Sequence, residues 1–244
     1  MIPIIPIASF ISALVSLGAT TRVFSLYRQR KNEALWYFGA WFAVVTIMFL
    51  NYALGGIVAS GVGNAVIDAI GNLFIYVSCV LLIQIPFIFL DRREWGVISG
   101  IILATAGLVF FIGLLLNPSP SVREVVGPYV FWWPQYEQWL RSYTGVVAGT
   151  TTLTFTLTFL YLGYRGRSDM VVFRRSAYLA AGMVSLMLSA LSILIVPKII
   201  FVERIVLGAT AMVAGIILLY YGLLWMPGTI SEVSEGSQAT KDLV

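Results

Sequence analysis

The stretch "AVIDAIGNLFIYVSCVLLIQIPFIFL" (65–90) decides the fold, because it runs for 26 residues with a single charged side chain, Asp68. A helix of about 20 apolar residues is long enough to cross the hydrocarbon core of a bilayer. Lipid offers no partners to free backbone N–H and C=O groups, whereas a helix satisfies them internally. The stretch therefore predicts a transmembrane helix.

The composition of the whole chain agrees with that prediction. The 244 residues are 59% hydrophobic and 11% charged, with a mean hydropathy of +0.93. Soluble domains carry about 25% charged residues, so these few charges cannot cover a soluble surface. The only cysteine, Cys79, lies within the apolar stretch, and histidine is absent. We therefore predict no disulfide framework, no metal site and no cofactor.

Seven apolar runs predict a polytopic all-α membrane protein with seven transmembrane helices. The runs lie at roughly 4–26, 34–57, 66–90, 96–116, 143–164, 173–196 and 201–225. We expect them to form a single domain over 1–226. No basic residue precedes the first run, so we interpret it as a retained span and not as a cleaved signal peptide.

The basic residues of the loops predict the orientation of the spans. The loops after the first, third and fifth spans, together with the C-terminal tail, hold eleven of the 15 Lys and Arg residues. Because such residues stay on the cytoplasmic side, we expect the N-terminus outside and the C-terminus in the cytoplasm. The main topology determinants are Arg28, Arg30, Arg165 and Arg167.

Two segments fall outside the spans. The outer loop 117–142 contains Trp132, Trp133 and Trp139, which we predict to be interfacial anchors, and Pro134, which can start a short helix in the interface plane. The tail 227–244 is polar and begins with Pro-Gly, so we expect a disordered cytoplasmic segment.

Polar residues inside the 65–90 stretch are the first candidates for a binding site. Asp68, Asn72 and Tyr76 share one helix face, whereas Gln84 lies on nearly the opposite side. Two interpretations are open for Asp68. It is a solvated interfacial acid, paired with Arg204 or Lys198, or it lines an outward-facing pocket with Asn72, since ionisable groups within spans mark functional sites.

A weak internal repeat widens this candidate site. The linkers "YRQRKN" (27–32) and "YRGRSD" (164–169) lie 137 positions apart, and a similar offset relates Asp68 to Glu203. Either the likeness follows from a shared place beside the membrane, or spans 1–3 repeat as spans 5–7 in a parallel 3+1+3 arrangement. In the second case Asp68 and Glu203, joined by Asn51, form one outer mouth. The ligand-binding candidates are therefore Asn51, Asp68, Asn72, Tyr76 and Glu203.

Stripes of small residues at helical spacing predict close helix contacts inside one bundle. They comprise Ser9, Ser12, Ser16 and Thr20; Gly145, Gly149, Thr152 and Thr156; Ala181, Ser185, Ser189 and Ser192; and Gly208, Ala211, Gly215 and Gly222. For the threonine-rich "TTTLTFTLTF" (150–159), two interpretations remain: the hydroxyls bond to their own helix, or they line a polar pathway.

Several functions of seven-helix proteins lack their required residues. The last span has no lysine for a retinal Schiff base, and the only Pro-Gln pair, Pro134-Gln135, lies in a loop and not in a span as in sugar transporters. Without histidine or clustered acids in the spans, we do not expect an enzyme. The predicted partner is the lipid bilayer, and no nucleic acid is expected.

Three segments resemble the seven-helix sensory membrane regions of prokaryotic histidine kinases. They are "YRQRKNEALWYFGAWFAVVTIMFLNYAL" (27–54), "NLFIYVSCVLLIQIPFIFLDRRE" (72–94) and "RRSAYLAAGMVSLMLSALSIL" (174–194). The family continues into a kinase domain, which this sequence lacks. The resemblance implies a stand-alone sensor in a prokaryotic plasma membrane that signals through a membrane or cytoplasmic partner.

Three functional hypotheses follow. The first is a non-enzymatic, receptor-like sensor. The second is a small-solute transporter or channel built from the three-helix repeat. The third is a structural or assembly subunit, in which the small-residue stripes serve contacts, including contacts between copies of the chain.

Overall fold

The computed structural model describes residues 2–58, 62–116, 121–134, 137–194 and 201–224. The helices are α1 (Ile4–Arg30), α2 (Glu33–Val58), α3 (Val62–Phe89), α4 (Arg93–Leu116), α5 (Gln138–Arg165), α6 (Met170–Leu194) and α7 (Phe201–Leu224). All seven are long and apolar enough to cross a membrane. The predicted class, a helical multi-pass membrane protein with seven spans, is confirmed at this level.

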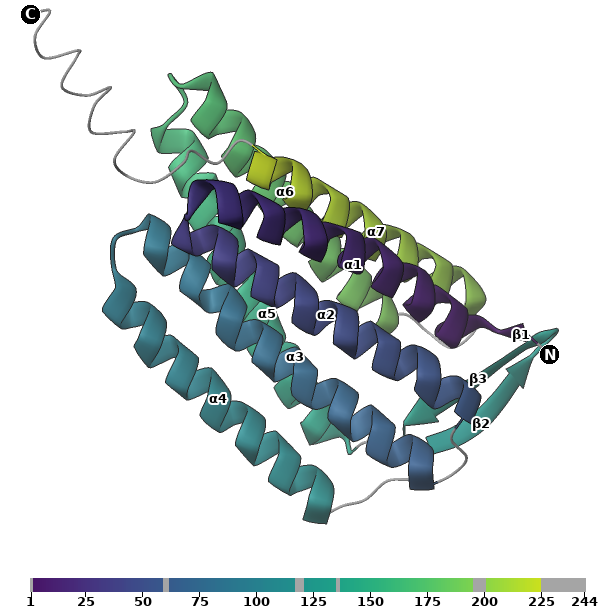
Figure 1. Cartoon of the computed structure of the whole chain (residues 1–244). Coiled ribbons are helices and arrows are strands. Elements are labelled where there is room, and N and C mark those ends of the chain that lie inside the picture. Colours follow the sequence, from purple (N-terminus) through teal and green to yellow (C-terminus); the bar gives the residue numbers. More distant parts are fainter. Residues whose placement is uncertain (1, 59–61, 117–120, 135–136, 195–200, 225–244) are drawn as a thin grey trace, which may run out of the picture.

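The helices lie side by side, so the connections gather at two ends of the bundle (Figure 1). The hairpin end carries a small sheet and the starts of α1 and α7. The arginine end carries the connections from α1 to α2, from α3 to α4 and from α5 to α6. Arg28, Arg30, Arg165 and Arg167 all belong to this second end.

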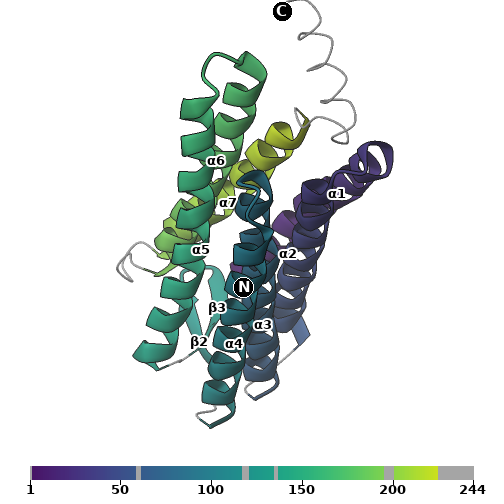
Figure 2. The ribbon, with the colours of Figure 1, turned by 90° about the vertical axis from the view of Figure 1, so that its left-hand side faces the viewer.

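Each helix packs on its neighbours in sequence, and two further contacts bring distant parts of the chain together. α7 packs on α1, and α5 packs on α3. α4 lies at the edge of the bundle against α3, with a smaller contact to α5 (Figure 2). Its outer side exposes apolar residues such as Ile101, Ile102 and Leu108, which suits a lipid-facing surface.

The core is built around α2. Phe38 and Phe42 are fully buried, and Phe38 meets Phe155 of α5 edge-on with ring centroids 5.9 Å apart. Met183 of α6 and Leu219 of α7 belong to the same buried cluster. About half of the α2 span is buried, and the face that carries Leu54 stays exposed.

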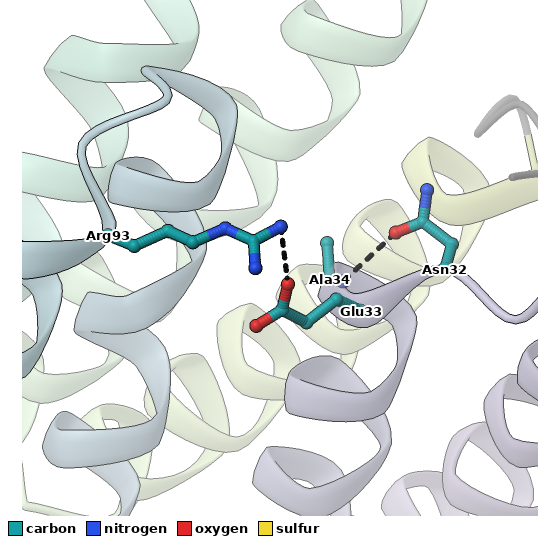
Figure 3. Close-up of polar contacts among 4 residues, drawn as sticks. All are labelled: Asn32, Glu33, Ala34 and Arg93. Atoms are coloured by element: carbon teal, nitrogen blue, oxygen red, sulfur yellow. Dashed lines mark hydrogen bonds and ion pairs between the residues drawn. The ribbon is translucent and has the colours of Figure 1, made fainter. Parts of the chain in front are cut away.

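The arginine end is ordered by two similar helix caps. The side-chain oxygen of Asn32 accepts a hydrogen bond of 2.9 Å from the Ala34 N–H, and the carboxylate of Asp169 accepts one of 2.8 Å from Val171 (Figure 3 shows the first). Asn32 thus ends the first of the two similar linkers and caps α2, and Asp169 ends the second linker and caps α6. The three-helix repeat itself stays a prediction.

An ion pair also joins two helix starts at the arginine end. The guanidinium of Arg93 on α4 lies 2.9 Å from the Glu33 carboxylate on α2 (Figure 3). Both side chains are exposed, so solvent screens their attraction and the pair contributes little stability.

The small-residue stripes mark real contacts in α1, α6 and α7. Ser16 of α1 donates to Phe42 O of α2 at 2.9 Å, and Ser185 and Ser189 of α6 donate to carbonyls of α7 at 2.7 and 2.6 Å. The predicted stripe of α5 behaves differently. A Cβ atom added at Gly145 or Gly149 would meet nothing within 4 Å, so no neighbouring helix packs closely against these two glycines.

The threonines of α5 bond within their own helix, as one of the two interpretations predicted. Thr150, Thr151, Thr152 and Thr154 each donate to a carbonyl four residues earlier. Such bonds satisfy a hydroxyl in an apolar environment without a polar pathway.

The segment after α4 differs from the expected interfacial helix. It forms a hairpin of β2 (Ser121–Val126) and β3 (Tyr129–Pro134), and β1 (Ile2–Pro3) pairs in parallel with β3. Pro134 ends a strand, and the next helix begins only at Gln138. The turn explains the hairpin: Gly127 has φ +57°, which the first position of a tight two-residue turn requires and which glycine adopts without strain.

The three predicted aromatic anchors fall into two elements. Trp132 and Trp133 belong to β3, in register with Arg123 and Val122 of β2, whereas Trp139 lies exposed in the first turn of α5. All three stand at the hairpin end, and their role as interfacial anchors stays a prediction. The predicted tail 227–244 lies outside the described residues.

Candidate functional site

Asn51 and its neighbours lie where α2 meets α3. The Asn51 side-chain amide donates a hydrogen bond of 2.7 Å to Ile67 O, which ties the two helices together. A Cβ atom on Gly71 would lie 2.6 Å from the Tyr52 ring, so the glycine makes room for that ring. This contact gives the polar Asn51 side chain, about two turns before the end of α2, a hydrogen-bond partner.

Asp68 and Asn72 lie one turn apart on α3, near the same contact. Both are half-buried, and the Asn72 side-chain amide donates to Asp68 O at 2.8 Å. The predicted common face of these residues is therefore present. Their proposed role as ligand contacts stays a prediction.

Tyr76 lies one turn further along α3, between α4 and α5. Its hydroxyl shares a hydrogen bond of 3.0 Å with Thr144 of α5, and its ring packs on Phe110 of α4 at a centroid distance of 5.1 Å. A Cβ atom on Gly107 would lie 2.8 Å from the Tyr76 side chain. Tyr76 thus fills a three-helix contact.

Glu203 occupies a different part of the bundle. It is exposed in the first turn of α7, a helix that packs on α1 and α6. The structure therefore gathers Asn51, Asp68 and Asn72 between α2 and α3 and places Glu203 on another helix.

Arg204, the residue after Glu203, is the buried charge of this region. Its side chain is 7% exposed, and its Nε–H donates a hydrogen bond of 2.9 Å to Ser192 O of α6. The charge pattern of the sequence predicts Arg204 only as an outer-side cation that can pair with Asp68. A signal was present nevertheless, because Arg204 continues the stripe of Gly208, Ala211 and Gly215 that packs on α6.

A cavity of about 130 Å³ lies beside Arg204, and we call it the hairpin-end cavity. It is lined by residues of α1, α2, α6 and α7 and is partly open. Its polar lining comes from Ser9, Ser12, Ser189 and Arg204, and its apolar lining includes Ile5, Phe49, Ile205 and Met212. Two helices from the beginning of the chain and two from its later part therefore form one candidate site.

The electrostatics of the cavity depend on Arg204. Among the described residues that line the cavity, it carries the only charge. The hydroxyls of Ser12 and Ser189 donate to Ala8 O at 3.0 Å and to Gly208 O at 2.6 Å. Their hydrogens thus bond to the helix backbones, and the surface that faces the cavity is almost entirely apolar, although the buried Arg204 lies beside it.

The cavity begins near the hairpin end and extends into the bundle. Ile5 lies in the first turn of α1 and Arg204 in the first turn of α7, whereas Ser12 lies about two turns deeper. β1 leads directly into α1, and the Ile2 N–H donates to Pro128 O at 2.8 Å. The small sheet therefore holds the end of a helix that lines the cavity.

Comparison with known proteins adds no family. No protein-family model matches the chain, and no curated protein matches it. Sequence and structure define the class as an integral membrane protein with seven helices long enough to span a bilayer.

Proposed function

We propose that this chain is a non-enzymatic, receptor-like membrane module that binds a small ligand in the hairpin-end cavity and acts through a partner at the arginine end. The observation that carries the proposal is Arg204, a nearly fully buried cation that lines a cavity within the spans. Charged residues inside membrane spans are costly, so their presence favours a functional role.

The proposal includes an orientation and a membrane. The arginine end faces the cytoplasm, since basic residues are retained there, and the hairpin end faces outward. The resemblance to histidine kinase sensory regions favours a prokaryotic plasma membrane. A ligand then enters from outside. The cytoplasmic side is contacted by a membrane or cytoplasmic signalling partner, or by a second copy of the chain.

The pair of α1 and α7 offers a physical link between the two ends. Both helices line the cavity at the hairpin end. At the arginine end, the Arg30 guanidinium donates to Leu224 O, the last residue of α7, at 3.4 Å. Because packed helices move as rigid units, a displacement at the cavity changes the arrangement at Leu224.

A small-solute transporter is the alternative function. The cavity within the spans favours it, since transporter substrates bind inside the bundle. The buried aromatic cluster of Phe38 and Phe42, in the first three turns of α2, with Phe155 of α5 favours the receptor-like module, because it packs the bundle between the cavity and the arginine end. The third hypothesis, a structural subunit, draws on the exposed apolar side of α4.

A cavity-filling variant tests the receptor-like function without a known ligand. Ala209→Phe places a ring where Ala209 lines the cavity, and Ala190→Phe, at similar depth on the exposed side of α6, is the matched control. Spin labels are attached at Glu94→Cys on α4 and Tyr221→Cys on α7, in a Cys79→Ala background. Double electron–electron resonance then measures the distance between the two labels at the arginine end.

We expect Ala209→Phe to shift the mean distance between the two labels by about 1–2 Å, the size of helix shifts in switching proteins. Ala190→Phe should leave the distance unchanged. An unaltered distance in a folded Ala209→Phe protein would contradict a coupling between the cavity and the arginine end.

A further inference from the structure

We propose that the hairpin-end cavity binds a neutral, apolar molecule about the size of a benzene ring, which can carry a single hydroxyl group directed at Ser9. The inference rests on the proposed function and names the ligand class of the same cavity. The lining, the bonding of its polar residues, the volume and the access each support one part of it.

The wall of the cavity favours an apolar ligand. Ile5, Phe49, Ile205 and Met212 contribute large apolar side chains, and the surface that faces the cavity is almost entirely apolar. An apolar molecule that fills such a space gains dispersion contacts on all sides. A charged or strongly polar molecule would instead lose its hydration without gaining hydrogen bonds.

Arg204 does not turn the cavity into an anion site. Its side chain is buried, and its Nε–H already donates to Ser192 O of α6 at 2.9 Å. Because this bond joins the first turn of α7 to α6, we assign Arg204 to the wall of the cavity as a positioning residue. The ligand is therefore expected to be neutral.

Ser9 supplies one polar position in the wall. It lies on α1, is 8% exposed and lines the cavity. The hydroxyls of Ser12 and Ser189 donate to backbone carbonyls, whereas the Ser9 hydroxyl bonds to none of the residues that the structure describes. A buried hydroxyl without a partner is costly, and a hydroxyl group on the ligand would supply that partner.

The volume sets the size of the ligand. The cavity measures about 130 Å³. An apolar protein cavity of about 150 Å³ accommodates benzene. One ring therefore fills the space, and a fused second ring exceeds it.

The access to the cavity lies along α1 and α7. The cavity is partly open, and its half-buried lining residues all belong to these two helices: Ile5 and Ala8 of α1, and Ile205, Ala209 and Met212 of α7. The lining residues from α2 and α6 are buried. A bound molecule thus contacts the pair of helices that the proposed function links to the arginine end.

Fluorinated probes test the ligand class. The full chain in phosphatidylcholine nanodiscs is titrated with fluorobenzene, 4-fluorobenzoate and 1-fluoronaphthalene, and fluorine NMR measures binding. Empty nanodiscs correct for partition into lipid. We expect saturable binding of one fluorobenzene per chain. At equal concentration in the lipid phase, the charged probe and the two-ring probe should bind at least about tenfold more weakly.

Two results would overturn the proposal. The first is the absence of saturable fluorobenzene binding, as expected if a lipid chain fills the cavity. The second is binding of 4-fluorobenzoate as tight as that of fluorobenzene, which would show that charge and not apolar contact governs the site.

A cavity-filling variant locates the binding. Ala209→Phe keeps Arg204 and fills the space, so it should abolish saturable binding of fluorobenzene. Ala190→Phe, on the exposed side of α6, should retain it. Undiminished binding by a folded Ala209→Phe protein would overturn the proposal.

The probe 4-fluorophenol tests the position of Ser9. Ser9→Ala should weaken its binding about threefold to tenfold, which corresponds to the loss of one hydrogen bond. The same variant should leave fluorobenzene binding within about twofold. Equal effects on the two probes would contradict the hydrogen bond between Ser9 and the ligand.

The outcomes separate this inference from the function on which it rests. Fluorobenzene binding that Ala209→Phe abolishes, without any distance change at the arginine end, would support the ligand class and contradict the receptor-like function. A distance change in Ala209→Phe together with no fluorobenzene binding would overturn the ligand class alone.

Discussion

Gln84 and Tyr76 are polar residues within the strongly apolar helix α3, and each is bonded to a neighbouring helix. The Gln84 side-chain amide donates to Gly96 O of α4 at 2.9 Å, and Tyr76 bonds to Thr144 of α5. Polar side chains join helices in this way where lipid provides no partner. The two residues are eight positions apart, so helical spacing separates them by only about 80° around the helix, and both lie against glycines of α4. Helical spacing could not name their partners, because these depend on how α4 and α5 pack.

Arg204 shows the limit of interpreting single residues from position alone. Because Glu203 and Arg204 stand at the start of a span, the sequence predicts the same outer position for both. The structure leaves Glu203 exposed and buries Arg204. The packing of α6 on α7 buries Arg204 and leaves Glu203 exposed. In the sequence, only a stripe of small residues indicates that packing.

Asn51→Leu tests the structural role of a polar residue that was predicted to bind a ligand. The substitution removes the 2.7 Å bond between α2 and α3, and we expect the free energy of unfolding to fall by about 0.5–1.5 kcal/mol. Thr105→Val is the control, since exposed Thr105 bonds only to Ile101 O of its own helix. Reversible unfolding in mixed micelles measures both, and equal stabilities of the two variants would contradict the account.

At the scale of elements, the helices could be predicted and the strands could not. Each predicted span overlaps one helix, because about 20 apolar residues leave the backbone no other solution in lipid. The hairpin lies outside that constraint. Its strands are short, and its aromatic residues suggested an interfacial helix starting at Pro134, whereas the Gly127-Pro128 turn directs the chain into β3.

The glycines of α5 show that a motif is weaker than a packed contact. Gly145 and Gly149 have the spacing of a helix-packing motif but open space around them, whereas Gly182 and Gly215 form the close crossing of α6 with α7. The spacing alone does not say which side of a helix a neighbour covers.

Gly215→Ala tests the close crossing of α6 and α7. A Cβ atom there would lie 2.9 Å from Gly182 O and 2.7 Å from a Leu186 methyl carbon, so the helices must move apart. We expect a loss of about 1–3 kcal/mol in the free energy of unfolding. Gly18→Ala, where a Cβ atom meets nothing within 4 Å, should be neutral or stabilising by up to about 1 kcal/mol. The reverse order of the two variants would refute this packing.

At the scale of the whole molecule, the bundle has two chemically different ends. The odd number of helices places the start of α1 at the hairpin end and the end of α7 at the arginine end (Figure 1). Loop charges predicted this separation. The lining of the cavity by four helices could not be predicted, because it requires α1 to pack on α7, which lies nearly a whole chain length away in the sequence.

The central claim is that the seven helices cross a membrane with the arginine end in the cytoplasm and the cavity near the opposite surface. Labelling of single cysteines in intact cells tests it most directly, with Val125→Cys in β2 and Arg167→Cys after α5, both exposed, in a Cys79→Ala background. We predict that a membrane-impermeant maleimide labels Val125→Cys in intact cells and Arg167→Cys only after permeabilisation. Labelling of Arg167→Cys from outside intact cells would contradict the orientation and the direction of signalling derived from it.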